Sequence, residues 1–220
     1  MSENKNLENE HYFKEKTEIP LSLGLLSGLI KGVQLEFYTS PPVFSWRNFD
    51  KGTLVLAENM EIKETDKTLL DLGCGYGVLG ICAAYFNPNL QVTMIDKSNR
   101  AVLLSLKNVQ KYNLKKRAKV LQGDLYEALK QPSIQPQTSN LRPQTFDVIV
   151  CNPPYSAGKV VVNKIIEQAP GHLNRGGNLQ IIGRKSKGGE MYKQKMIDVF
   201  GNCDEFGINS GYRVYRSVKK

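Results

Sequence analysis

A strand, a glycine-rich turn and the start of a helix follow one another between Leu69 and Gly80, and this succession restricts the fold more than any other segment. Glycine supplies the positive φ angles and the close approach that such a turn needs. A turn of this kind at the carboxyl end of a strand is where open α/β sheets bind nucleotides. From Lys67 onward strands and helices alternate, which is typical of a parallel sheet covered by helices on both faces.

The alternation predicts the order of the elements. Strands are expected at residues 68–72, 91–95, 118–122, 146–151 and 178–182, with a C-terminal antiparallel hairpin from 204–209 and 212–218. Helices are expected at residues 78–86, 99–112, 125–130, 160–172 and 191–200. Between them, the segment 131–144 is rich in Pro, Gln, Ser, Thr and Asn and is predicted to form a surface loop.

Residues 1–60 precede the alternating region and are predicted to form an N-terminal extension packed on a catalytic domain of residues 61–220. Within the extension, apolar and polar residues alternate from Gly32 to Tyr38, which indicates a short strand. The segment 50–53, Asp-Lys-Gly-Thr, is typical of an N-cap for a helix that continues to Met60.

The cysteines and histidines are too sparse for metal or disulfide chemistry. The cysteines form no C-x-x-C pair and stand at Cys74, Cys82, Cys151 and Cys203. A zinc site or disulfide framework is therefore not expected. With only 2 histidines, His-based catalysis is poorly supplied. No apolar run approaches the roughly 20 residues that span a bilayer, and the first residues lack a secretory signal, so we predict a cytoplasmic protein without a metal or a membrane.

The chain is strongly basic. Its formal net charge is +9 and its pI is near 9.3, and many of the lysines and arginines lie in the last third. A basic protein attracts polyanions, and nucleic acid is the commonest polyanionic partner. Charge alone leaves this partner undecided, because many basic proteins bind no nucleic acid.

Two cofactors compete for the glycine turn. Residues 75–80 fit the pattern G-x-G-x-x-G, which binds the pyrophosphate of dinucleotides. Asp96, after the next strand, would bind ribose hydroxyl groups under either interpretation. Asp71 discriminates between them, because a carboxylate at the tip of the first strand would repel a pyrophosphate but could hold the ammonium of a zwitterionic cofactor.

The pattern D-x-G-x-G-x-G, formed by Asp71, Gly73, Gly75 and Gly77, is typical of class I methyltransferases that use S-adenosylmethionine. S-Adenosylmethionine is therefore the predicted cofactor. Asp124 follows the third strand of the alternating region and is predicted to accept the adenine amino group, although it could also cap the short helix at Leu125.

The segment Asn152-Pro153-Pro154-Tyr155 follows the apolar strand at residues 146–151. Proline lacks an N–H and has a fixed φ, so the carbonyl groups of Asn152 and Pro153 can point outward beside the Asn152 side-chain oxygen. Such acceptors would bind both hydrogens of a planar amine, and Tyr155 would lie against its ring. The segment thus predicts an N-methylation site, with catalytic roles for Asn152, Pro153 and Tyr155 and contact of Asn152 with the cofactor.

On these motifs the chain resembles the methyltransferase small domain family, whose best-known members are small-subunit ribosomal RNA guanine-N2 methyltransferases. The resemblance extends from residue 11 to the end and rests on the segments 37–39, 43–45, 50–53, 71–77, 152–154, 157–159, 200–202 and 211–213, with Asp96 and Arg100-Ala101. It implies a Rossmann-like fold with a seven-stranded, mostly parallel sheet. It also implies an exocyclic amine in RNA, most of all guanine N2 of ribosomal RNA in the small subunit, as methyl acceptor.

The acceptor side of the site is predicted from aromatic and basic residues. Phe44 is a predicted substrate-binding residue that could stack on a flipped base or close over the cofactor, or else be an ordinary core residue, and Tyr155 would contact the acceptor ring. Arg184 and Lys185 could bind phosphates or belong to a solvated charged loop, and Lys159 is a further predicted substrate-binding residue. Three other functions remain open: a protein-glutamine N-methyltransferase, a DNA adenine methyltransferase, and an RNA assembly factor that binds S-adenosylmethionine with little turnover. The sequence leaves the oligomeric state and the modified nucleotide open.

Overall fold

The predicted strand at 68–72 lies inside a seven-stranded sheet in the computed structural model, which describes residues 22–130, 144–153 and 158–220. The strand order is β5-β4-β3-β6-β7-β9-β8. The parallel strands are β3 (Thr68–Leu72), β4 (Gln91–Asp96), β5 (Ala118–Gln122), β6 (Phe146–Cys151) and β7 (Leu173–Arg184). The strands β8 (Asp204–Asn209) and β9 (Tyr212–Val218) complete the sheet as an antiparallel hairpin. The predicted Rossmann-like fold is confirmed.

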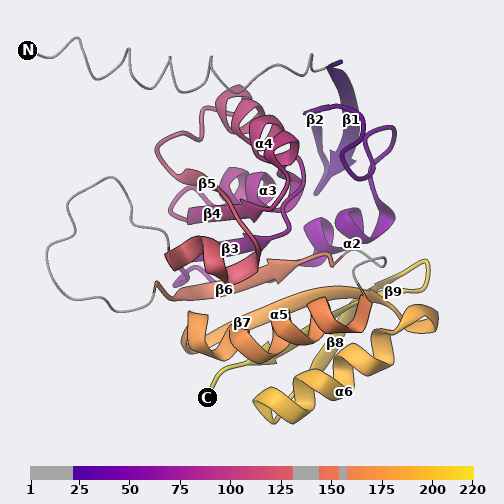
Figure 1. Cartoon of the computed structure of the whole chain (residues 1–220), viewed down its shortest axis with the longest axis vertical. Helices are drawn as coiled ribbons and strands as arrows, with labels where there is room; N and C mark the ends of the chain where they lie inside the picture. The colour runs from indigo at the N-terminus through magenta and orange to yellow at the C-terminus, as the bar shows by residue number, and fades with distance from the viewer. Residues whose placement is uncertain (1–21, 131–143, 154–157) are drawn as a thin grey trace, which may run out of the picture.

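Helices cover both faces of the sheet, as predicted, and the strand residues alternate between two hydrophobic clusters (Figure 1). Leu69 of β3 belongs to the cluster that contains α2 (Lys51–Asn59), α3 (Val78–Phe86) and α4 (Asn99–Lys111). Leu70 and Leu72 belong to the cluster on the other face. That face is covered by the 3₁₀ helix η1 (Leu125–Lys130), α5 (Gly158–His172) and α6 (Gly189–Phe200). Within the described ranges, no helix has the length and apolarity to cross a membrane.

An N-terminal hairpin of β1 (Gly24–Ile30) and β2 (Val33–Thr39) forms a separate two-stranded sheet. It is joined to α4 by Asn108, whose side chain accepts from the Tyr38 backbone N–H (2.7 Å) and donates to the Tyr38 carbonyl (2.9 Å). The strand β1 was not predicted. Its outward positions include Leu25 and Leu29, which are exposed, so the polar alternation that reveals a half-buried strand is missing from the sequence.

Most element boundaries agree with the sequence prediction, and the differences have local causes. The strand β7 begins at Leu173 rather than at residue 178, because its first part pairs with the start of β6 across an irregularity. The helices α5 and α6 each begin two residues earlier than predicted, at Gly158 and Gly189, because apolar periodicity does not mark a glycine start. Most of the predicted loop at 131–144 lies outside the described residues.

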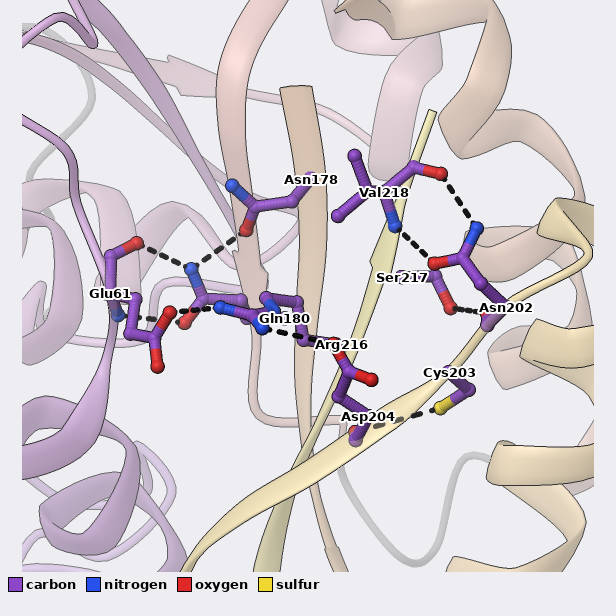
Figure 2. Close-up of polar contacts among 9 residues, drawn as sticks. All are labelled: Glu61, Asn178, Gln180, Asn202, Cys203, Asp204, Arg216, Ser217 and Val218. Atoms are coloured by element: carbon purple, nitrogen blue, oxygen red, sulfur yellow. Dashed lines mark hydrogen bonds and ion pairs between the residues drawn. The ribbon is translucent and has the colours of Figure 1, made fainter. Parts of the chain in front are cut away.

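Hydrogen bonds and ion pairs hold the segment that follows α2 against the sheet (Figure 2). Gln180 of β7 donates to the Glu61 carbonyl (2.7 Å) and accepts from the Glu61 N–H (3.0 Å), and it also donates to Asn178 (2.8 Å). Arg216 of β9 forms ion pairs with Glu61 and with Asp204. The segment that leaves α2 is therefore held against β7 and β9, which fixes where α2 lies over the sheet.

Replacing Gly80 by alanine is expected to destabilise the fold by about 1–3 kcal/mol, because the core around it has no room for a methyl group. A Cβ at Gly80 would lie 2.5 Å from both Cγ and Sδ of Met94 in β4. Thermal unfolding measures the effect. Gly171 provides a matched control, since a Cβ there meets nothing within 4 Å and its replacement by alanine should leave the melting temperature nearly unchanged.

Candidate active site

The candidate site lies where the strand order reverses. The chain proceeds outward from β3 through β4 to β5 and then returns to β6, on the other side of β3. Leu72 of β3 is level with Cys151 of β6, so the glycine turn and Asn152 leave the sheet side by side. In open α/β sheets this switch point is the usual place for a ligand.

Two adjoining cavities open at this edge. The larger has a volume of about 300 Å³ and lies over the ends of β3, β4 and β6, with walls from α5 and the segment 42–44. The smaller, of about 40 Å³, lies against the glycine turn and the start of α2. Both cavities are lined by Phe44, Gly73, Gly75 and Asn152. Asn152 therefore stands at the junction of the two cavities.

The glycine turn has the backbone that its sequence predicts. Gly73, Gly75 and Gly77 have φ angles of 71°, 58° and 94°, which only glycine adopts readily. The N–H groups of Gly73 and Cys74 donate to the Ile95 carbonyl, and the Gly75 N–H donates to Asp96 (2.9 Å). Pyrophosphate binding requires free N–H groups at a helix start. In the first turn of α3, the Gly80 N–H already donates to the Asp71 carboxylate (2.9 Å), whose charge would repel a pyrophosphate, so the turn is poorly suited to a dinucleotide.

Asp71 lies buried beneath the turn and borders the smaller cavity. Its Oδ2 accepts from the Gly80 N–H (2.9 Å), whereas its Oδ1 is buried without a partner among the described residues. The pKa of Asp71 is raised to about 7, mainly because the carboxyl group is buried; the Gly80 N–H offsets part of this rise and the charge of Asp96 adds to it. An unpaired buried carboxylate oxygen beside a cavity is suited to a cationic donor, as an ammonium group would provide.

Asp96 and Asp124 both line the larger cavity. The Asp96 carboxylate accepts from the Gly75 N–H and from the Ser98 N–H (2.8 Å), so it also holds the turn in shape. Asp124 is exposed and forms a salt bridge of 3.6 Å with Lys164 of α5. At the start of η1 it is the Asp124 backbone carbonyl, and not the side chain, that accepts from the Glu127 N–H (3.1 Å).

Among the residues that the structure describes, the Asn152 amide is hydrogen-bonded through its nitrogen only. Its Nδ2 donates to Asp50 Oδ2 (2.7 Å) and to Thr53 Oγ1 (2.8 Å), which uses both of its hydrogens. A carboxylate can only accept a hydrogen bond, so the nitrogen must be the atom that faces Asp50. Asn152 Oδ1 therefore points away from Asp50. Pro153 follows as a buried residue, and Tyr155 lies outside the described residues.

The predicted acceptor-side residues lie at the same edge but at different depths. Phe44 is 56% exposed and lines both cavities. Lys159 is exposed at the start of α5, while Arg184 ends β7 beside the Tyr212 ring and Lys185 pairs with Glu190. None of these three basic residues lines either of the two cavities.

Sequence reasoning missed two residues of the site, Asp50 and Thr53. It identified the segment 50–53 as a helix N-cap, and the structure confirms that role, because Asp50 Oδ2 accepts from the Thr53 N–H at 2.7 Å. Nothing in the sequence brings this segment near Asn152, which lies 102 positions after Asp50. Both residues line the smaller cavity.

Comparison with known proteins gives consistent results. A family model described as methyltransferase small domain matches residues 34–216. The Bacillus subtilis (strain 168) protein YbxB is 30% identical over 211 residues, which are 96% of this chain and 99% of that protein. The ribosomal RNA large subunit methyltransferase G of Shewanella denitrificans is 32% identical over 191 residues, which are 84% of this chain and 46% of the relative.

A solved structure is similar throughout the fold. The Thermus thermophilus 16S rRNA N2 G1207 methyltransferase RsmC, in complex with AdoMet and guanosine, superposes with a TM-score of 0.74 at 25% identity. The match covers 92% of this chain and 52% of that structure. The chain therefore spans about half the length of the ribosomal RNA methyltransferases that it resembles.

Proposed function

Because the chain belongs to the methyltransferase small domain family, we propose that it methylates an exocyclic amine of a nucleobase in RNA, with guanine N2 of ribosomal RNA as the preferred acceptor. Membership in the family confirms S-adenosylmethionine as the cofactor. The observation that carries the proposal is the position of Asn152 at the junction of the two cavities, next to the glycine turn. There, one side chain can contact both a methyl donor and an acceptor.

The residues present fit S-adenosylmethionine at both of its polar ends. Asp71 Oδ1, which has no partner in the described ranges, would bind the ammonium of its methionine part. Asp96 and Asp124 in the larger cavity would bind the ribose hydroxyl groups and the adenine amino group. Ile95, Leu125 and Ile165 give that cavity apolar walls for the adenine ring. When bound, S-adenosylmethionine supplies an electrophilic methyl group on its sulfonium.

The proposed role of Asn152 is to bind and orient the amine that accepts the methyl group. An aromatic amine is a weak nucleophile, because its lone pair is delocalised into the ring. Asn152 Oδ1, with the backbone carbonyls of Asn152 and Pro153, would accept the amine hydrogens and hold the nitrogen toward the methyl group. The same oxygens stabilise the positive charge that develops on nitrogen. The methylated nitrogen is strongly acidic and loses its proton to water, so no strong base is needed.

The proposed RNA acceptor is supported by charge and by the relatives. The chain carries a net charge of +9, and Lys159, Arg184 and Lys185 lie at the edge of the sheet where the cavities open. Ribosomal RNA is named as the substrate of the matched large-subunit enzyme and of the matched solved structure, which holds guanosine. Phe44, exposed between the cavities, is suited to contact a base. Tyr155 keeps its proposed role beside Asn152.

Transfer of a tritiated methyl group tests the proposal. The protein is incubated with labelled S-adenosylmethionine and total RNA from a strain that lacks its gene, and the labelled nucleosides are then identified by mass. We expect label in N2-methylguanosine. Label in N6-methyladenosine would indicate that adenine, and not guanine, is the acceptor. Label only in protein would contradict the RNA acceptor, and tight binding of RNA without any label would indicate an assembly factor instead.

A further inference from the structure

The start of α2 contacts Asn152 in addition to capping its own helix. We infer that Asp50 and Thr53 are positioning residues that fix the Asn152 amide with its oxygen toward the methyl acceptor. The inference rests on the proposed function, because it assigns these two residues to the same N-methylation site. Neither residue is expected to contact the reacting atoms.

The hydrogen bonds allow only one orientation of the amide. Asp50 Oδ2 accepts from the Thr53 N–H (2.7 Å), from Thr53 Oγ1 (3.2 Å) and from Asn152 Nδ2 (2.7 Å). Since the Thr53 hydroxyl donates to Asp50, its oxygen lone pairs face Asn152 and accept the second Nδ2 hydrogen at 2.8 Å. Turning the amide over would place Asn152 Oδ1 against the Asp50 carboxylate, which is repulsive.

The carboxylate itself is firmly placed. Asp50 has an extended backbone, with φ −65° and ψ 131°, as an N-cap residue requires. A Cβ on Gly52 would lie 3.0 Å from Asp50 Oδ2 and 3.0 Å from the Tyr212 ring, so the carboxylate is closely packed against the start of α2. At its other end, α2 leads into Glu61, which is bonded to Gln180 of the sheet (Figure 2). The helix is thus held at both ends, and its start forms a rigid support for Asn152.

The hydrogen bonds from Asn152 Nδ2 to Asp50 and Thr53 also make Asn152 Oδ1 a stronger hydrogen-bond acceptor. An amide whose N–H groups donate to an anion has more negative charge on its oxygen, since hydrogen bonds in series polarise one another. Asp50 would therefore make Asn152 Oδ1 a better acceptor for an amine that becomes positively charged. Positioning matters as much, because a small misplacement of a reacting group lowers a rate by as much as about 100-fold.

A set of matched variants tests the inference. Thr53→Val keeps the shape of the side chain but removes the oxygen that accepts from Asn152, while Thr53→Ser keeps that oxygen. Asp50→Ser keeps an N-cap acceptor and removes the carboxylate. Thr68→Val is the control, because Thr68 also bonds to an aspartate, Asp147 (3.0 Å), but at the opposite edge of the sheet.

The first readout is the rate of labelled methyl transfer to the same total RNA. Thr53→Val and Asp50→Ser are expected to lower kcat about tenfold or more, with the KM for S-adenosylmethionine changed less than about threefold. Thr53→Ser should restore most of the rate that valine removes, and Thr68→Val should not lower it. A purely structural role would lower the melting temperature of Thr53→Val and Asp50→Ser without this division between kcat and KM.

The second readout needs no turnover, so it separates this inference from the proposed function. The Asn152 side-chain NH₂ signals, assigned in ¹⁵N spectra by their loss in Asn152→Ala, should exchange slowly with water in the unchanged protein. They should exchange faster in Thr53→Val and Asp50→Ser. Equal exchange in all variants, or an unchanged kcat in them, would overturn the inference. A protein that labels no RNA but shows these exchange differences would contradict the RNA acceptor while leaving the positioning role supported.

Discussion

Replacing Asn152 by alanine is expected to lower the rate of methyl transfer about 100- to 1000-fold, the range typical of losing one preorganised polar contact in a transition state. The amide oxygen that orients the acceptor amine disappears, and Asp50 and Thr53 lose their partner. Binding of S-adenosylmethionine should weaken less than about threefold, because the proposed contacts of its ammonium, ribose and adenine remain. Single-turnover methyl transfer and calorimetric titration with S-adenosylmethionine measure the two effects.

Asn87→Ala is the control for this variant. Asn87 ends α3 near the start of β4, at the edge of the sheet opposite the cavities, and donates to the Ala83 carbonyl (2.9 Å). Its replacement is expected to affect stability alone. If Asn152→Ala transferred methyl groups at an undiminished rate, Asn152 would not be catalytic and the acceptor would have to bind elsewhere.

Replacing Asp71 by asparagine is expected to weaken the binding of S-adenosylmethionine on the order of 100-fold or more, because a buried ammonium would lose its charged partner. In the protein without ligand, burial raises the pKa of Asp71 to about 7, so a large share of this carboxyl group is protonated below neutral pH. The proton must leave before the carboxylate can bind an ammonium group. Affinity for S-adenosylmethionine should therefore rise with pH.

The predicted size of the rise in affinity with pH follows from the ionised fraction of Asp71. Between about pH 5.5 and pH 7 that fraction rises by roughly tenfold or more for a pKa near 7, and the association constant should rise with it. Above about pH 8 the affinity should fall again, because the amino group of S-adenosylmethionine loses its own proton. Calorimetric titrations across this range measure the profile.

Asp71→Asn should remove the rise below neutral pH and leave only the fall above it. Asp66→Asn is the matched control, since Asp66 lies in the turn before β3 and accepts from the Lys63 N–H. That variant should keep the complete profile. A wild-type affinity that stays constant from about pH 5.5 to pH 7 would show that Asp71 does not bind the ammonium in its ionised form.

Much of this site was predictable, because the residues concerned follow strands directly. Parallel strands end at one edge of a sheet, so the glycine turn after β3, Asp96 after β4, Asp124 after β5 and Asn152 after β6 had to lie along the same edge once the strands were identified. Asp71 was also assigned before the structure, from its charge beside the glycine turn. The structure adds the reason why Asp71 suits an ammonium group, namely burial with one oxygen that has no partner within the described part of the chain.

The strand β1 and the contact between the start of α2 and Asn152 could not be predicted in this way. The outward leucines of β1 erase the alternation on which strand prediction depends. The segment 50–53 contributes to the family resemblance, but the sequence assigns it only a helix N-cap, a pattern that reports local hydrogen bonds. Their contact with Asn152 joins positions about a hundred residues apart and depends on where α2 packs over the sheet.

The sequence by itself therefore determined the α/β fold, the glycine turn for a methyl donor and the amide that follows β6, because each depends on local periodicity or on residues adjacent in the chain. Only the tertiary structure decided which way that amide points. The orientation of a side chain depends on partners that the sheet and its helices bring together, and here those partners are the carboxylate and hydroxyl at the start of α2.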